Sequence, residues 1–131
     1  MLVLNPNLNE VIFMLGNVYY FSGQLEQAKQ AYHTLSQRTP TDVRVWNNLG
    51  ETCFHLKQYQ EAIQHLSKTV SMSPGLLPVY MRLAECYDRT GNTGSARKLL
   101  EDLAKKDLPA SDRQAIVAGI AQLGKKDKTT A

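Results

Sequence analysis

Residues 46–74 read WNNLGETCFHLKQYQEAIQHLSKTVSMSP, and the positions that stand out in this stretch recur at a fixed distance along the chain. The pair Leu49-Gly50 and the small residue Ala62 each have equivalents 34 residues before and after them. These equivalents are Leu15-Gly16, Leu83-Ala84, Ala28 and Ala96. A repeat of roughly 34 residues is typical of stacked helix pairs. The stretch therefore predicts an all-α repeat protein.

Large side chains recur in the same register. They form three columns, which are Ile12, Trp46 and Tyr80; Tyr19, Cys53 and Tyr87; and Tyr32, Leu66 and Leu100. Spacings of three and four residues within each repeat place these side chains on one stripe of two successive helices. The small residues let the two helices approach closely. We expect the columns to form the core, with Cys53 and Cys86 as buried, unpaired thiols.

The pattern resembles the tetratricopeptide repeat, whose signature runs W-x₂-L-G-x₂-Y, A-x₃-F and P. Residues 46–74 match it best, although Cys53 stands where Tyr is usual. The resemblance extends over residues 9–108 and implies a right-handed α-solenoid of three helix-turn-helix repeats with a C-terminal capping helix. We expect repeats at 9–42, 43–76 and 77–110, a capping helix at 111–124 that Ser111 caps and Gly124 ends, and a disordered tail at 125–131.

The beginning of the chain continues the same register. Pro6 lies 34 residues before Pro40, which lies 34 before Pro74, so residues 1–8 fit the end of a preceding, truncated repeat. Either Met1 starts a truncated chain or the native protein opens with a remnant of a repeat. Apolar residues follow at this end, among them Phe13 and Phe21. They predict a missing neighbouring repeat or self-association through the N-terminal end.

The family resemblance implies that the first helices line a concave groove that binds a peptide or protein segment. Transferred to this sequence, the groove residues are Phe13, Asn17, Tyr20, Phe21, Arg44, Asn48, Glu51, Phe54, His55, Arg82, Glu85 and Arg89. The groove is aromatic at its N-terminal end and charged at its C-terminal end, which favours an extended peptide with a hydrophobic anchor at one end and charged residues at the other. Alternatively, the aromatic residues only pack against an upstream repeat. Phe13 and Arg82 lie off the packing columns, so we expect their replacement to leave stability nearly unchanged.

Members of the family that grip the carboxylate tails of heat-shock chaperones use Lys, Asn, Asn, Lys and Arg in the groove. The matching positions here hold Phe13, Asn17, Asn48, Pro78 and Arg82. Both lysines are missing and only Arg82 discriminates, so binding of such tails is disfavoured. The two asparagines and Arg82 are still able to orient a peptide backbone or a single carboxylate.

Other functional classes receive little support from the sequence. No nucleophile or acid–base pair has catalytic spacing, and no cofactor is expected. His55 has no Cys or His neighbour at metal-ligand spacing, so no metal is expected either. The net charge is +3 and comes entirely from residues 97–131, without an aromatic row, which disfavours nucleic acid. The chain has no apolar run of about 18 residues and no secretion signal, and we expect a cytoplasmic protein.

The sequence thus predicts a non-catalytic protein–protein interaction module with a scaffold or adaptor role. The alternative is a structural or regulatory segment of a longer scaffold subunit or enzyme, which contacts mainly its neighbouring repeats or associates with itself.

Overall fold

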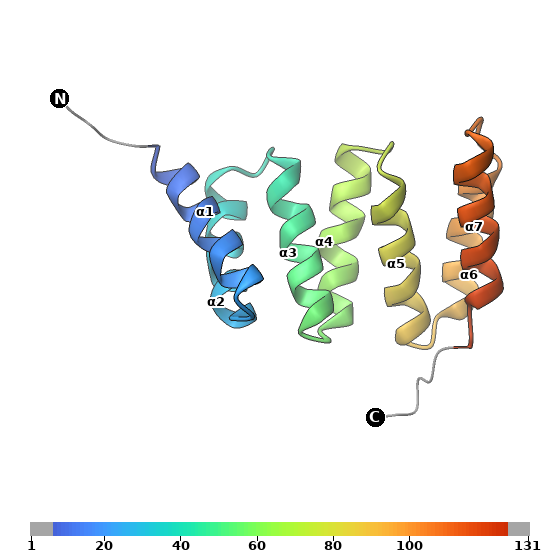
Figure 1. Ribbon diagram of the computed structural model, residues 1–131, viewed down its shortest axis with the longest axis horizontal. Helices are drawn as coiled ribbons and strands as arrows, with labels where there is room; N and C mark the ends of the chain where they lie inside the picture. The colour runs from blue at the N-terminus through green and yellow to red at the C-terminus, as the bar shows by residue number, and fades with distance from the viewer. Residues whose placement is uncertain (1–6, 126–131) are drawn as a thin grey trace.

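The computed structural model describes residues 7–125, and over this range the chain forms seven α-helices and no strand. The helices are α1 (Leu8–Phe21), α2 (Leu25–Arg38), α3 (Val43–His55), α4 (Tyr59–Met72), α5 (Leu77–Arg89), α6 (Thr93–Ala104) and α7 (Ala110–Gln122). They follow one another along the long axis of the molecule, from α1 and α2 at one end to α6 and α7 at the other (Figure 1). The prediction of an all-α solenoid is confirmed. The predictions for residues 1–6 and 126–131 lie outside the described residues.

The turn inside each helix pair repeats with the sequence. Gly23, Lys57 and Gly91, 34 residues apart, all adopt positive φ angles of 84°, 64° and 89°. The residue after each of them donates a backbone hydrogen bond of 2.8 Å to the residue five positions earlier. Glycine takes this left-handed conformation without strain, whereas Lys57 carries a Cβ there. The three turns give each pair the same tight reversal.

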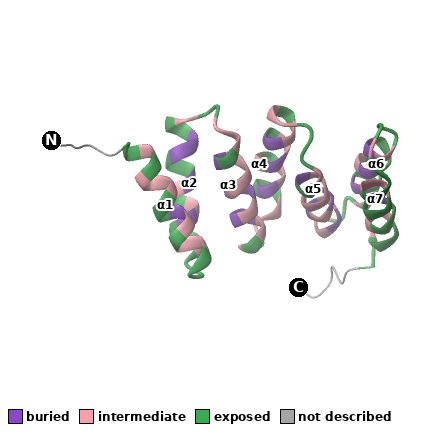
Figure 2. Ribbon diagram, turned by 45° about the horizontal axis from the view of Figure 1, so that its top comes forward, coloured by how far each residue is buried: buried purple, intermediate pink, exposed green. Residues whose placement is uncertain are grey.

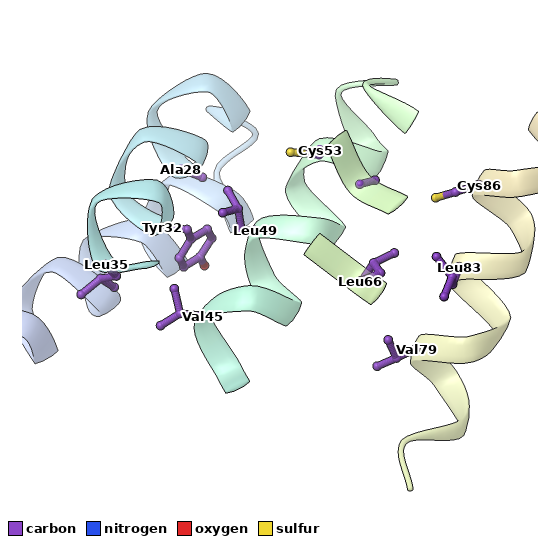
Figure 3. Packing of buried hydrophobic residues seen from close by; sticks show 11 residues of the cluster. Ala28, Tyr32, Leu35, Val45, Leu49, Cys53, Leu66, Val79, Leu83 and Cys86 are labelled. Carbon is purple, nitrogen blue, oxygen red and sulfur yellow. The ribbon is translucent and has the colours of Figure 1, made fainter. Parts of the chain in front are cut away.

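The core runs through the stack between the helices. Its largest fully buried side chains include Tyr32 and Leu35 of α2, Leu49 of α3 and Leu66 of α4. Figure 3 shows Tyr32 beside Leu49 and Val45, and Leu66 beside Leu83 of the next pair. Each second helix therefore packs both against its own partner and against the following repeat.

Glycines at two column positions set the distance between paired helices. A Cβ on Gly16 would lie 2.7 Å from Cε1 of Tyr32, and one on Gly50 would lie 2.6 Å from Cδ2 of Leu66. Real Cβ atoms do not approach other carbon atoms so closely, so the larger side chain on the second helix fills the space that glycine leaves. The prediction that small residues permit close approach is confirmed at both positions.

The equivalent leucines of the three repeats are not equally buried. Leu49 and Leu83 are buried, but the equivalent Leu15 of α1 is 46% exposed. Leu49 is covered by the preceding helix α2, and within residues 7–125 no helix precedes α1. A place in the packing column is therefore not enough to bury a side chain at the end of a stack.

The last helix closes the other end. Ile116 is buried, and Ile120 and Leu123 pack with it against the second part of the core. Exposed residues cover much of the rest of α7 (Figure 2). The helix begins at Ala110 after Pro109, and the expectation that Ser111 caps it is wrong. Proline fixes its own φ, here −57°, so the chain enters the helix directly after it.

The end of α7 is tied to the last turn of α5. Gly124 has the expected positive φ, 80°, and its N–H donates to both carboxylate oxygens of the buried Asp88, at 3.1 and 3.2 Å. The Thr93 hydroxyl donates to the same carboxylate at 2.6 Å. Asp88 thus satisfies donors from two elements and fixes α7 against α5. Within the described range, no helix combines the length and the apolar character needed to cross a membrane.

Candidate functional site

Two hollows lie along the first helices of the helix pairs. We call these hollows and the residues around them the groove. The smaller hollow, about 90 Å³, is lined by Asn17, Tyr20, Phe21, Tyr32, Asn48 and Glu51. The larger, about 640 Å³, lies between α3, α5 and α7 and is lined by Asn47, Glu51, Pro78, Val79, Met81, Arg82, Ala84, Glu85, Asp88, Leu100, Gly119, Gln122 and Leu123. Only the larger hollow has the volume of an ordinary small-ligand or side-chain pocket.

The asparagines of the smaller hollow bind a tyrosine of the core. The hydroxyl of Tyr32 donates to Oδ1 of Asn17. Burial and the nearby Tyr20 raise the pKa of Tyr32 to about 12, although a hydrogen bond with Asn48 opposes this effect. Part of the hydrogen-bonding capacity of both amides is thus used inside the protein.

Phe13 is a packing residue rather than a free anchor. Its ring meets that of Tyr32 edge to face, with the centroids 6.1 Å apart, and the Arg44 guanidinium lies 4.4 Å from its centroid. Arg44 is held in turn by Asp42 at 2.8 Å and by Glu10 at 3.4 Å. Phe13 thus lies off the packing columns, but its side chain joins α1 to α2 and α3.

An aromatic cluster joins the C-terminal ends of α1 and α3. The Tyr20 ring meets Phe21 and His55 edge to face, with centroids 5.1 and 5.8 Å apart. Phe54 meets His55 in the same manner at 5.2 Å. Phe21 remains 83% exposed and is the most accessible large apolar side chain of the groove.

Arg82 is the centre of the charged part of the groove. Its Nε donates to both carboxylate oxygens of Glu51, at 3.2 and 3.0 Å, and Nη1 donates to Glu85 at 3.2 Å. The guanidinium also lies 4.0 Å from the ring centroid of Phe54. Burial alone would lower the pKa of Arg82, but the hydrogen bond and charge of Glu51, with Glu85, raise it. Arg82 thus lies off the packing columns, as its place in the repeat predicts, but still joins α3 to α5.

The ion pairs continue to the end of α5. Nη2 of Arg89 donates to Glu85 at 3.1 Å, and Nη1 donates to the Tyr59 hydroxyl at 3.3 Å. At the other end, Nε2 of His55 lies 3.8 Å from Glu51. Acidic and basic side chains thus alternate along the groove, and each arginine neutralises a carboxylate within it.

The structure divides the expected groove residues into two groups. Seven of them line the hollows, and Phe13, Arg44, Phe54, His55 and Arg89 flank them through the contacts above. The sequence reasoning missed the contribution of α7. Gly119, on which a Cβ would lie 2.6 Å from Cε of Met81, brings this helix to the edge of the larger hollow. A glycine within the apolar pattern of the last helix was the available sign of this close approach.

Neither cysteine is an activated nucleophile in the protein as it stands. Cys53 and Cys86 are unpaired and buried, as expected. Burial raises the pKa of the Cys53 thiol to about 11 and that of the Cys86 thiol to about 12. Thiols of this kind stay protonated at neutral pH, so neither is an activated nucleophile.

The family comparison agrees with this architecture. Residues 54–120 match the family model described as "Tetratricopeptide repeat", and residues 1–69 match one described as "Anaphase-promoting complex, cyclosome, subunit 3". The chain belongs to the tetratricopeptide repeat family.

Curated relatives are much longer than this chain. Sperm-associated antigen 1 of Mus musculus is 28% identical over 107 residues, which cover 75% of this chain and 12% of the relative. The peroxisomal targeting signal receptor of Candida glabrata is 37% identical over 71 residues, which cover 54% of this chain and again 12% of the relative. The matches therefore describe one segment of each of these proteins.

Solved structures share the fold over nearly the whole chain. The TPR2B domain of yeast Sti1, in its complex with pHsp70, has a TM-score of 0.76 and 22% identity, covering 89% of this chain and 96% of that one. PcrH, in complex with the chaperone binding region of PopD, has a TM-score of 0.77 and 22% identity, covering 93% and 95%. At this identity the likeness establishes the fold.

Proposed function

We propose that the chain is a non-catalytic interaction module that binds an extended protein segment in its groove. The larger hollow carries this proposal, because it combines apolar surface from Met81 and Leu123 with the charged side chains of Glu51, Arg82 and Glu85. Apolar surface with a few placed polar groups is typical of sites that hold a side chain of a partner. Relatives of the same fold that were solved with bound partners support this proposal.

The charges of the hollow favour a basic segment over a carboxylate tail. Three acidic side chains line it, Glu51, Glu85 and Asp88, against Arg82, and Arg89, just outside the lining, pairs with Glu85. Arg82 already binds two of these carboxylates, so an incoming carboxylate would have to displace them. A ligand with a large apolar residue next to a Lys or Arg satisfies both features of the hollow.

The experiment is a selection of random peptides displayed on phage against the full chain, followed by affinity measurements on the selected peptides. We expect them to carry an apolar residue beside a basic one. Gln122→Arg places a cation at the rim of the larger hollow and should weaken binding at least tenfold. Gln114→Arg makes the same change at an exposed position of α7 outside that hollow and should leave binding unchanged. Equal affinities for the two variants, or selected peptides that are acidic, would contradict the proposal.

A second candidate function is favoured by the exposed face of α1. Val11, Leu15 and Val18 are equivalent to Val45, Leu49 and Thr52, which are all buried between repeats. Leu15 is 46% and Val18 62% exposed. We propose that this face packs against an amphipathic helix, either of a neighbouring repeat or of a second copy of the chain.

The cellular location of the protein, expected from the sequence to be cytoplasmic, stays a prediction.

Light scattering coupled to size exclusion tests association between copies. A dimer that becomes a monomer on Leu15→Glu would support self-association. A monomer at high concentration would exclude it and leave the neighbouring repeat as the occupant of this face.

A further inference from the structure

Three side chains with metal-binding groups meet in the second helix pair, outside the groove. They are Cys53 at the end of α3 and Glu61 and His65 on α4. One ligand atom from each, the Sγ, a carboxylate oxygen and an imidazole nitrogen, lies within 4.8 Å of the other two. None of the three residues lines either hollow of the groove.

The backbone brings these residues together. Glu61 and His65 are four residues apart and share one face of α4. The tight turn through Lys57 reverses the chain directly after Cys53, and the N–H of Gln58 donates to the Cys53 carbonyl at 2.8 Å. The first turns of α4 therefore lie beside the last turn of α3. The arrangement results from the fold and not from flexible loops.

The cluster occurs in one repeat alone. The equivalent positions hold Tyr19, Gln27 and Ala31 in the first repeat and Tyr87, Ser95 and Leu99 in the third. Neither of these sets can supply three metal ligands. The second repeat thus replaces the usual tyrosine of its packing column with a thiol, beside a histidine and a carboxylate that the other repeats lack.

The ring of His65 is held in its orientation by neighbouring residues. Its ring packs against Trp46, with the centroids 5.8 Å apart and the planes tilted by 32°. Trp46 is fixed in turn by a hydrogen bond of 2.9 Å from its Nε1 to the carbonyl of Pro40. A ligand whose ring is held by its neighbours loses less conformational freedom when a metal binds.

We propose that Cys53, Glu61 and His65 bind a zinc ion, with water in the fourth position. Thiolate, imidazole and carboxylate are the three kinds of ligand that zinc takes from proteins, and three of them with an open position form a common arrangement. Zinc bonds of about 2.0–2.3 Å place the ligand atoms roughly 3.5 Å apart. The exposed Glu61 side chain can make the required approach by changing its rotamer.

Zinc binding would displace the Lys29 ammonium from the Glu61 carboxylate. The Lys29 ammonium now pairs with Glu61 at 2.8 Å and donates to Oε1 of Gln58 at 2.6 Å. Zinc takes the place of Lys29 at the carboxylate, and the Cys53 thiol releases its proton to the solvent as the Zn–S bond forms. Lys29 therefore opposes metal binding, and its removal should strengthen it.

Cobalt(II) is the probe for this site, since tetrahedral thiolate-bound cobalt shows a near-ultraviolet charge-transfer band and visible d–d bands that zinc abolishes. The full chain should develop these bands with one equivalent of cobalt and lose them on addition of zinc. Cys53→Ser should abolish the charge-transfer band. Cys86→Ser, the matched control at the other buried cysteine, should leave it unchanged.

Three further variants keep the thiol in place, and they test the two remaining ligands and the competing Lys29. His65→Ala and Glu61→Gln should each weaken zinc binding at least tenfold, and Lys29→Met should strengthen it severalfold. Melting curves with and without zinc show whether each variant is folded and whether the metal still raises its Tm. The proposal is wrong if the wild-type chain gives no charge-transfer band, if the band depends on Cys86, or if His65→Ala binds zinc as tightly as wild type. None of these outcomes bears on the groove.

Discussion

Arg82 on α5 grips Glu51 on α3 through Nε, at 3.2 and 3.0 Å from the two carboxylate oxygens. This pair links the first helices of two successive repeats across the floor of the groove. The same guanidinium reaches Glu85 and covers Phe54. A residue that looks like a ligand-binding cation in the sequence therefore also takes part in holding the repeats together.

The first prediction concerns this pair. Arg82→Met removes the guanidinium with its contacts to Glu51, Glu85 and Phe54, and Glu51→Gln removes the charge of the partner. A double-mutant cycle should give a coupling of about 1 kcal/mol, the upper end for exposed pairs, because the two side chains are only 29% and 24% exposed. Urea denaturation of the four proteins measures it. A coupling indistinguishable from zero would show that the pair does not join the repeats.

The second prediction compares equivalent leucines. Leu49→Ala empties a fully buried position and should lower the free energy of unfolding by about 2–5 kcal/mol. Leu15→Ala, 34 residues earlier, removes a side chain that is 46% exposed and should cost less than about 1 kcal/mol in the monomer. Similar losses for the two variants would mean that Leu15 is covered in solution.

The third prediction concerns glycine at the close approach of α3 and α4. Alanine is the better helix former by about 1 kcal/mol, but a Cβ on Gly50 would meet Leu66 at 2.6 Å. Gly50→Ala should therefore destabilise the chain by about 1–3 kcal/mol. The control is Gly94→Ala in α6, where a Cβ meets nothing within 4 Å and the change should be neutral or stabilising. Thermal unfolding distinguishes the two, and a stabilised Gly50→Ala variant would refute the packing argument.

The fourth prediction concerns pH. A side-chain hydrogen bond from Arg44 holds the pKa of Asp42 below its usual range, and the Arg44 backbone N–H, which Asp42 caps, adds to the effect. Between the two pKa values the unfolded chain binds more protons, so this contribution to stability is complete above about pH 4 and is lost as the pH falls through the lower, folded pKa. Asp42→Asn keeps a capping oxygen without the charge.

Unfolding of the two proteins across the acid range measures this contribution. The wild-type chain should lose its advantage over Asp42→Asn as the pH falls through that window. A stability difference between them that stays constant with pH would contradict the role of the Asp42 charge.

The repeat made most of the fold predictable, because a side chain in a packing column has the same neighbours in each complete repeat. Leu49 and Leu83 follow this rule, and Leu15 departs from it because burial depends on a preceding helix. Contacts between side chains on different helices were harder to predict. The contacts of Arg82 with Glu51 and of Phe13 with Tyr32 join different helices, and the relative rotation of those helices cannot be obtained from periodicity alone.

The meeting of Cys53 with His65 was missed for a related reason. Their separation of 12 residues fits no common spacing of metal ligands, and only the tight turn at Lys57 brings the ends of α3 and α4 together. Likewise, the last helix was expected only as a cap, whereas Gly119 allows it to line the larger hollow. Both predictions would have required the packing of one helix against another, which the spacing of residues in the sequence does not give.

The most direct measurement for the proposed function is an NMR titration of the labelled full chain with a peptide obtained from the phage selection. If the segment lies in the groove, the amide signals of Glu51, Met81, Arg82, Glu85 and Gln122 should shift most, and those of Arg97 and Gln114 should remain unchanged. Shifts concentrated on α4 and α6, with the groove signals unmoved, would contradict binding in the groove.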